Sequence, residues 1–443
     1  MRKKTLTLSV LAAAVTMATG QAQAAAFQLA EQSTTGLGRA YAGEGAAAEN
    51  ASVLGRNPAA MTLFDRSSLS AGAVYVNPEV DVEGKPTAGQ AAAAGIAGLP
   101  TQSNDIADDA VVPFFYYVQP INEQWAAGLG IFTNYGLSTT YQDDHYAGPV
   151  AGKTSLTTIN VNPSIAYRVN PHLSLGAGFN AVYADAELIR HAGVLYNGLV
   201  DQALQNPAFG GNVTAAQNYV AQQTGLTGPT SEAARLTGDD WGYGWNIGLM
   251  LEADEHNRWA LTYRSEVDLT LEGKYAGTSS AGQTVPGKLD LTLPAIAELS
   301  GFHQVDPAWA VHYGIMWTQW SSFEELKALG SDGGTLFEKP EKFNNSWRVS
   351  AGLTHQLNDQ WTLRGGLAYD QSPVPEATRS ISIPDVDRTW YTLGATYAVS
   401  QNLSVDAAFA FLDGGKVDVV EDGFAFTSGG DAYLMGLQMN YQF

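Results

Sequence analysis

Arg190 is the residue whose type and position point most clearly to binding chemistry. A cation on a mostly small or apolar strand face favours binding of a carboxylate, because guanidinium N–H groups match carboxylate oxygens in charge and geometry. A cation at an inward position of a strand could equally form a structural ion pair with an acidic residue, so the pattern is compatible with ligand binding and with an ion pair. Alternate residues of one predicted strand share this face with Arg190: Ser174, Gly176, Gly178, Asn180, Val182, Ala184, Ala186 and Leu188.

Other clusters could bind a metal or act as a nucleophile, but their patterns are weak. The stretch Asp143–His145 (DDH) could hold a divalent cation, although adjacent acidic residues are more often simply solvated. The stretch Gly277–Ala281 (GTSSA) lacks the last glycine of a nucleophile elbow, and the seven histidines are scattered. There is no cysteine, which excludes thiolate chemistry and disulfides. We therefore expect no catalytic residue, no metal site, no cofactor and no enzymatic activity.

Residues 1–24 have the pattern of a secretory signal peptide. Basic residues at positions 2–4 precede an apolar run from Leu6 to Met17, and Ala22-Gln23-Ala24 is a small-x-small cleavage pattern. The run is shorter than the ~20 residues that a membrane-spanning helix needs. We expect the mature chain to begin at Ala25.

The mature chain is strongly acidic. Without the three basic residues of the signal peptide it has 20 basic and 44 acidic residues, a formal charge of −24. This charge excludes nucleic acid as a partner, because a phosphate backbone requires a basic surface. Export without cysteines suits a bacterial envelope protein. No later apolar run approaches ~18 residues, which excludes helical membrane spans.

From about Ser67 onward, apolar and polar residues alternate strictly. The polar face carries charges and glycines, and the apolar face has aromatic residues at its ends, which is typical of a transmembrane β-barrel. In the last strand the apolar face holds Tyr433, Met435, Leu437, Met439, Tyr441 and Phe443. In the segment from Trp259 we expect one lipid-facing side with Trp259, Leu261, Tyr263, Val267, Leu269 and Leu271, opposite Thr262, Arg264, Glu266, Asp268, Thr270 and Glu272.

Turn signals predict the number of strands. Six short connections recur, near residues 122–124, 170–172, 253–257, 304–307, 358–360 and 400–402. With both termini in the periplasm, they predict an all-β, antiparallel barrel of about 14 strands over residues 67–443. The sheet must close, since an open edge in lipid leaves backbone groups unsatisfied. The C-terminal strand ends in Phe443, through which we expect contact with the barrel-assembly machinery.

Residues 25–66 are expected to plug this barrel. The segment has no sustained period, and its glycines indicate tight turns in close-packed backbone. A barrel of this width is too wide for its own side chains to fill. Asn57-Pro58-Ala59 fixes one turn, although Asn-Pro alone is a common turn pattern. No strand precedes the glycines and no Gly-Lys-Ser/Thr follows, so a phosphate-binding loop is disfavoured.

The third strand carries Asn134-Tyr135-Gly136 where a membrane strand should continue. Such residues inside a strand favour a bulge or kink, and a kink here would make a side opening. The alternative is that the strand ends and turns outward. The longest loop runs from Asn197 to Asp239; its stretches Gly198–Leu204 and Ala215–Gln223 are expected to form short amphipathic helices that could catch an apolar ligand.

The chain resembles the FadL-type long-chain fatty acid transporters of the Gram-negative outer membrane over essentially the whole mature sequence. The segments that carry the resemblance are FQLAEQSTTGLGRAYAGEGA, RNPA, FDRSSLSAGAVYVNP, TNYGLSTTY, GFNAVYA, WGYGWNIG, ALTYRSEV, FEELKA and RSISIPDVDR. The resemblance implies a 14-strand barrel, a hatch in the lumen, a hydrophobic pocket, and lateral exit of the ligand at the third-strand kink.

The resemblance also implies site residues. Arg190 and Lys339 match the basic residues near the family's high-affinity pocket, and Phe27 matches the start of the hatch. Asn57-Pro58-Ala59 matches the hatch turn, and Asn134-Tyr135-Gly136 matches the kink that forms the lateral opening. Parity does not place Lys339, because Pro340 can interrupt the ladder. The loop from Tyr275 to Lys288 looks shorter than its counterpart, which puts the outer collecting groove in doubt.

The expected function is passive uptake of long-chain fatty acids across the bacterial outer membrane, in contact with outer-membrane lipid. One alternative is a channel for aromatic or alkane hydrocarbons, which have no carboxylate and would be indifferent to the charge of Arg190. An alternative of another class is an outer-membrane lipid hydrolase, which the weak nucleophile pattern disfavours.

Overall fold

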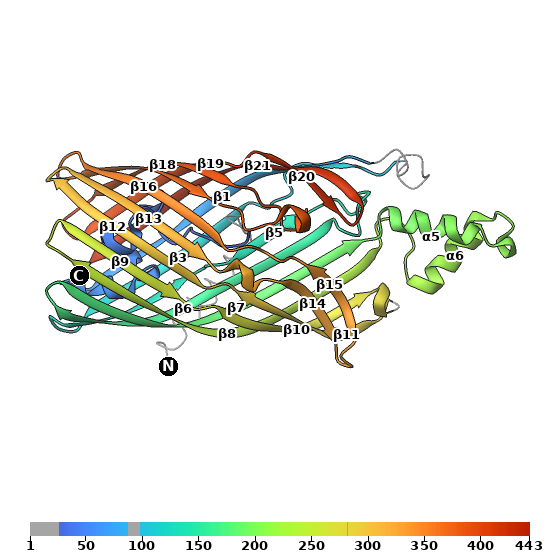
Figure 1. Ribbon diagram of the computed structural model, residues 1–443, viewed down its shortest axis with the longest axis horizontal. Helices are drawn as coiled ribbons and strands as arrows, with labels where there is room; N and C mark the ends of the chain where they lie inside the picture. The colour runs from blue at the N-terminus through green and yellow to red at the C-terminus, as the bar shows by residue number, and fades with distance from the viewer. Residues whose placement is uncertain (1–25, 87–97, 281) are drawn as a thin grey trace.

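The computed structural model describes residues 26–86, 98–280 and 282–443. The predicted signal peptide, Ala25 and Ala281 lie outside these residues. Most of the described chain forms one long barrel whose strands run obliquely to its long axis (Figure 1).

The barrel is closed and has 14 antiparallel strands, which confirms the predicted fold class. The first and last strands pair from Ser68 opposite Gln442 to Gly84 opposite Phe426, so no backbone edge is left to face lipid. In chain order the strands are β1 (Ser68–Gly84, with the short β2, Gln102–Ser103, beside it); β3 (Ala110–Pro120); β4 (Trp125–Phe132) with β5 (Gly136–Thr140); β6 (Gly152–Asn170); β7 (Leu173–His191); β8 (Glu232–Glu252); β9 (Asn257–Arg264) with β10 (Val267–Gly277); β11 (Thr284–Leu293) with β12 (Ile296–Asp306); β13 (Trp309–Thr318) with β14 (Glu325–Gly330); β15 (Thr335–Pro340) with β16 (Ser346–Gln356); β17 (Trp361–Asp370); β18 (Arg388–Ala398); β19 (Leu403–Asp413) with β20 (Lys416–Glu421); and β21 (Phe424–Gln442).

The predicted short turns are present at one end of the barrel. They are residues 121–124, 171–172, 253–256, 307–308, 357–360 and 399–402. Trp125, Trp309 and Trp361 follow three of these turns and are about two-fifths exposed on the outer surface. Amphipathic rings at this level form the aromatic girdle expected where a barrel wall meets the membrane interface.

Alternation holds along β21 but is wrong along the segment from Trp259. In β21, Met435, Leu437 and Met439 are exposed on the outside, and Gln438 and Asn440 are buried inside, as predicted. In β9, Leu261 is exposed as predicted, but in β10 the predicted lipid-facing residues Val267, Leu269 and Leu271 are buried in the interior, while Asp268 and Glu272 are exposed.

A one-residue irregularity explains this inversion. Arg264 lies opposite Asn246 of β8, whereas Glu272 lies opposite Asp239, so β9–β10 uses one residue more than β8 between these pairs. Ser265 and Glu266 form the bulge, and Ser265 Oγ accepts a hydrogen bond from the Trp245 N–H at 2.9 Å. An extra residue transfers every following side chain to the opposite face.

The N-terminal segment lies inside the barrel, in the half that carries the short turns (blue in Figure 1). It folds into short helices: α2 (Thr34–Leu37), α3 (Glu44–Ala47), η1 (Ala51–Gly55) and η2 (Pro58–Leu63). Ion pairs tie it to itself and to the wall. Arg39 pairs with Glu44 at 2.5 Å and with Glu49 at 2.7 Å, and Glu49 pairs with Arg364 of β17 at 3.1 Å.

The long loop after β7 forms α5 (Val194–Leu204) and α6 (Val213–Thr224), near the two predicted stretches. These helices project beyond the barrel at the end opposite the short turns (Figure 1). Among the described residues, no helix is both long enough and apolar enough to cross a membrane.

Candidate functional site

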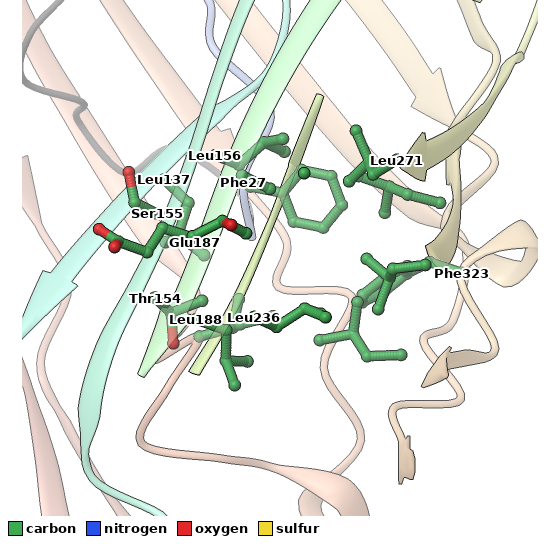
Figure 2. Close-up of a pocket in the computed structure, with 17 residues that line it drawn as sticks. Phe27, Leu137, Thr154, Ser155, Leu156, Glu187, Leu188, Leu236, Leu271 and Phe323 are labelled. Carbon is green, nitrogen blue, oxygen red and sulfur yellow. The ribbon is translucent and has the colours of Figure 1, made fainter. Parts of the chain in front are cut away.

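An apolar cavity lies inside the barrel between the N-terminal segment and the strands around β7 and β11. Its volume is about 60 Å³. Figure 2 shows the ring of Phe27 projecting into it, between Leu156 on one side and Leu271 and Phe323 on the other. The Phe27 ring packs edge-on against Trp320 and Phe323, with centroids 4.6 and 5.2 Å away. The lining is completed by Leu137, Thr154, Ser155, Ala186, Glu187, Leu188, Leu236, Thr237, Gly238, Leu289, Leu291, Leu326 and Ile383.

Arg190 and Lys339, predicted to act together, meet at the rim of this cavity. Arg190 is 4% exposed and donates hydrogen bonds to Thr154 Oγ1 at 3.2 Å and to Ser382 Oγ at 2.9 Å. Lys339 Nζ donates to the same Ser382 Oγ at 3.3 Å. Thr154 and Ile383, which follows Ser382, both line the apolar cavity. The two cations therefore converge where the cavity becomes polar.

Two carboxylates stand beside these cations. Glu421 Oε1 lies 2.5 Å from Lys339 Nζ, and Glu421 Oε2 accepts the Ile381 N–H at 2.8 Å. Glu341, in the connection between β15 and β16, is fully buried, with Oε1 3.8 Å from Lys339 Nζ. Burial raises the pKa of Glu341 to about 7, against the opposing effect of Lys339. Within the described residues no carboxylate lies within 4.0 Å of Arg190.

A second cavity, lined by both charged and apolar residues, adjoins the cation pair on the side of the outer loops. It measures about 260 Å³ and is lined by Arg190, Lys339, Arg379 and Glu421, with apolar contributions that include Phe337. Arg190 and Lys339 thus lie between a vestibule that contains charged side chains and an interior cavity that is almost wholly apolar. An amphiphile with an anionic headgroup fits this boundary, because its two ends prefer the two sides.

The third strand is interrupted at the predicted place. β4 ends at Phe132 and β5 resumes at Gly136, and both pair with β6, so the strand does not turn away outward. The N-terminal segment bonds to the interruption: the Leu29 N–H donates to Asn134 O at 2.7 Å, and the Gly136 N–H donates to Phe27 O at 2.8 Å. Asn134 and Tyr135 are 6% and 4% exposed, so the kink is covered in this structure.

Asn57, Pro58 and Ala59 form a turn packed directly on the barrel wall. Asn57 Oδ1 accepts the Ala59 N–H at 3.0 Å, and Asn57 Nδ2 donates to Gly45 O at 2.9 Å. The wall residue facing Asn57 is Gly248, where an added Cβ would lie 2.0 Å from Asn57 Oδ1. A glycine in the wall is what permits this close approach.

The weaker motifs gain no support from their geometry. In the described part of the chain, no three His, Asp or Glu side chains are grouped to hold a metal ion. Asp143 instead lies 3.4 Å from His191 Nε2, and burial lowers the pKa of His145 to about 4. Ser279 Oγ donates to the backbone carbonyl of Leu336.

Sequence reasoning missed several residues of the site. Leu271, Leu289 and Leu291 line the cavity because their strands invert their faces at the interruptions after Arg264 and Leu293. No sequence signal pointed to these leucines, because Asp268, Glu272 and Asp290, which alternate with them, lie on the exposed outer face, whereas the avoidance of lipid by carboxylates predicts the opposite arrangement. Ser382 belongs to a loop, and no periodicity points to it.

A closed barrel with apolar residues on its outer face and an aromatic girdle defines a membrane-spanning β-barrel of the outer-membrane type. A family model described as outer membrane protein transport protein (OMPP1/FadL/TodX) matches residues 15–443. The long-chain fatty acid transport protein of Escherichia coli (strain K12) is 44% identical over 458 residues, which cover 100% of each chain.

Solved structures agree. The crystal structure of a Pseudomonas aeruginosa FadL homologue superposes with a TM-score of 0.78 at 25% identity, over 95% of this chain and 100% of that one. The Pseudomonas putida toluene transporter TodX shares the fold, with a TM-score of 0.66 at 18% identity, over 95% of this chain and 100% of that one. The chain belongs to the OMPP1/FadL/TodX family of transport proteins of the bacterial outer membrane.

Proposed function

We propose that this protein carries long-chain fatty acids across the outer membrane by diffusion down a gradient. Its relative from Escherichia coli is named a long-chain fatty acid transport protein, and that relative aligns over its full length. Because the chain belongs to a family of transport proteins, we favour transport over the alternative of a lipid hydrolase.

The convergence of Arg190 and Lys339 on Ser382, at the rim of an apolar cavity, is the observation that carries the proposal. The carboxylate of a fatty acid would accept hydrogen bonds from the two cations, taking the place of Glu421 on Lys339. Its chain would enter the apolar cavity, where each buried CH₂ contributes about 0.8 kcal/mol.

Phe27 must move for a long chain to enter. A cavity of about 60 Å³ is far smaller than the several hundred Å³ that pockets for such ligands occupy. The ring of Phe27 stands in the middle of the lining side chains (Figure 2). We therefore assign residues 25–66 the role of a hatch inside the lumen of a barrel of residues 67–443, and Phe27 the role of a ligand-contacting side chain that the acyl chain displaces.

Withdrawal of Phe27 would also uncover the kink. The backbone of Phe27 and Leu29 holds Asn134 and Gly136 by hydrogen bonds, so one movement frees both the pocket and the wall. β3 and β4 stop pairing beyond Phe115 and Ile131, so beside Asn134–Gly136 there is a gap in the strand pairing, which resumes at Ala107 and Thr139. Lateral exit through this gap requires that the ligand bind more tightly when Phe27 is withdrawn than when it is in place. Only such a difference in affinity can shift the equilibrium between the two positions of the hatch.

Contacts with other components of the membrane belong to the same proposal. Met435, Leu437 and Met439 would face outer-membrane lipid, and Phe443, 60% exposed at the end of the last strand, would present that strand to the barrel-assembly machinery. Phe443 is held to the barrel through its N–H, which donates to Ser67 O at 2.9 Å.

The test compares Arg190→Ala and Lys339→Ala with Lys327→Ala, which removes a partly exposed cation paired with Glu338 on the same β14–β15 hairpin. We expect the Kd for oleate to rise roughly tenfold or more in the first two and to stay unchanged in Lys327→Ala, since a hydrogen bond to a charged group contributes about 1.5–3 kcal/mol. If Arg190→Ala and Lys339→Ala bind and take up oleate as the wild type does, and the protein also takes up toluene, the results would instead support a hydrocarbon channel.

A further inference from the structure

Arg264 is a second cation in the lumen, placed at the kink. It is the last residue of β9, immediately before the bulge at Ser265–Glu266, and its side chain is partly exposed to the interior. It lines a small cavity of about 10 Å³ together with Asn134 and Tyr135 of the interrupted third strand. This cavity lies apart from the vestibule at Arg190 and Lys339.

Arg264 has no counter-ion in the part of the chain that the structure describes. Its guanidinium donates hydrogen bonds to Gly55 O at 2.9 Å and to Asn180 Oδ1. It also lies over the ring of Phe132, with Arg264 Cζ 5.3 Å from the ring centroid. By contrast, Arg56 pairs with Glu298 at 3.3 Å. A charge held inside a membrane barrel without an opposite charge is costly, and such residues mark ligand pathways.

Hydrogen bonds connect Arg264 to the kink. Asn180 Oδ1 accepts from Arg264 and also from Asn160 Nδ2 at 2.9 Å. The same Asn160 Nδ2 donates to Asn134 Oδ1 at 3.1 Å. The positive charge is therefore linked, through two amide side chains, to the residue at which the third strand breaks.

An apolar wall connects the cavity at Arg264, here called the lower cavity, to the apolar cavity around Phe27, here called the upper cavity. On β11, Leu289 and Leu291 line the upper cavity, and the next inward residue, Leu293, lines the cavity at Arg264. On β7, Leu188 lines the upper cavity and Val182 the lower one, six residues or about 20 Å along the strand. The inward residues between the two cavities on β7 are Ala184 and Ala186, so an acyl chain that moves along these two strands stays against apolar side chains.

We propose that Arg264 is a second binding site for the carboxylate of the transported acid, used after the headgroup leaves Arg190 and Lys339 and before the ligand passes the kink. The inference rests on the proposed function. Its ligand class is an anionic amphiphile; a neutral molecule of the same length gains nothing from this cation.

Arg258 provides a matched control. It lies on the same strand, donates to the N-terminal segment through Ala47 O at 3.1 Å, and stacks over Phe302 at 4.2 Å. Replacing Arg258 or Arg264 by Gln removes one bond to the N-terminal backbone and one cation–ring contact. The Arg264→Gln variant alone removes the charge at the cavity beside Asn134, together with the hydrogen bond to Asn180.

The experiment measures uptake of oleate and of oleyl alcohol by cells that produce the full-length wild type, Arg264→Gln, Arg264→Lys or Arg258→Gln. We expect Arg264→Gln to lower oleate uptake roughly tenfold while oleyl alcohol uptake and the oleate Kd at the upper site stay unchanged. Arg264→Lys should keep most of the oleate uptake, and Arg258→Gln should behave as the wild type. With purified wild type and excess oleate labelled with ¹³C at C1, a second bound carboxylate signal is expected, and it should be absent in Arg264→Gln.

The inference is overturned if Arg264→Gln and Arg258→Gln are alike in oleate uptake, if Arg264→Gln loses oleate and alcohol uptake equally, or if the wild type shows a single bound carboxylate signal. The number of bound carboxylate signals in the wild type tests the inference even if Arg264→Gln does not fold. These results would leave the proposed function standing, which instead fails if Arg190→Ala and Lys339→Ala bind and take up oleate as the wild type does.

Discussion

Glu341 places a titratable carboxylate beside the cation pair. Its Oε1 lies 3.8 Å from Lys339 Nζ, and neither of its oxygens has a hydrogen-bond partner within the described chain. Because burial raises its pKa to about 7, the group is largely neutral at pH 6 and largely anionic at pH 8. Its negative charge at pH 8 competes with an anionic ligand for the same two cations.

We therefore expect the affinity for an anionic amphiphile to fall, by up to about tenfold, as the pH rises from 6 to 8. Hexadecyl sulfonate is a suitable probe, because its own charge is constant over this range. Titration calorimetry should show the pH dependence in the wild type and in Glu338→Gln, whose exposed carboxylate pairs with Lys327. Glu341→Gln should bind the sulfonate equally at both pH values, and an unchanged pH dependence in that variant would contradict the role given to Glu341.

Single residues differ in how far the sequence could predict them. Arg190 follows from parity, because β7 is uninterrupted from Leu173 to His191 and each second residue keeps its face. Lys339 came from resemblance, since β15 ends at Pro340 and the strand resumes only at Ser346. Ser382 accepts from both cations, yet it lies in a loop, where no repeating pattern fixes the direction of a side chain.

At the scale of strands, interruptions set the limit of the prediction. Alternation predicted the lipid-facing side of β21 and of β9, but the bulge at Ser265–Glu266 inverted β10, so three residues expected to face lipid line the interior. A bulge is specified by one residue and its neighbours on the adjacent strand, here the Ser265 hydroxyl and the Trp245 N–H. Period alone cannot locate such a contact, because the partner is distant in sequence.

The contact between η2 and β8 gives a test at this scale. An added Cβ at Gly248 would lie 2.0 Å from Asn57 Oδ1 and 3.1 Å from Pro58 Cδ. Asn57 cannot retreat without losing its bonds to Gly45 and Ala59. We expect Gly248→Ala to destabilise the docked segment by about 1–3 kcal/mol, as overpacking does, and to increase ion leakage through the barrel.

Conductance in planar bilayers and the thermal midpoint of the purified protein measure these effects. The control is Gly365→Ala on β17, where the nearest atom to an added Cβ is 3.7 Å away, an ordinary contact. A Gly248→Ala protein as stable and as closed as Gly365→Ala would show that this contact does not hold the segment in the lumen.

For the whole molecule, the barrel was predictable because membrane physics leaves few choices: a closed sheet, short turns at one end and outward apolar residues. The position of the N-terminal segment depends on contacts that join distant parts of the chain. Thr35 Oγ1 donates to Asp406 of β19 at 2.7 Å, and Arg56 reaches Glu298 of β12. Composition indicated a plug, but only the fold shows which wall residues it meets.

The same segment links the pocket to the kink, and a reversible crosslink tests whether transport needs that link to break. Gln28 and Tyr135 are antiparallel partners flanked by the two bonds Leu29 N–H to Asn134 O and Gly136 N–H to Phe27 O. Residues in such a pair have Cα atoms about 4.5 Å apart, within the range for a disulfide. The chain has no cysteine, so a Gln28→Cys, Tyr135→Cys protein can form one disulfide only.

We expect the oxidised double variant to keep the barrel fold and to lose oleate uptake, because Phe27 can then leave neither the pocket nor the kink. A reductant should restore uptake, and each single variant should be indifferent to oxidation. Circular dichroism checks the fold, and gel mobility after thiol labelling gives the fraction crosslinked. If the fully crosslinked protein took up oleate as fast as the reduced one, the acid would have to pass while Phe27–Leu29 stays paired with Asn134–Gly136, and a route through the kink would be excluded.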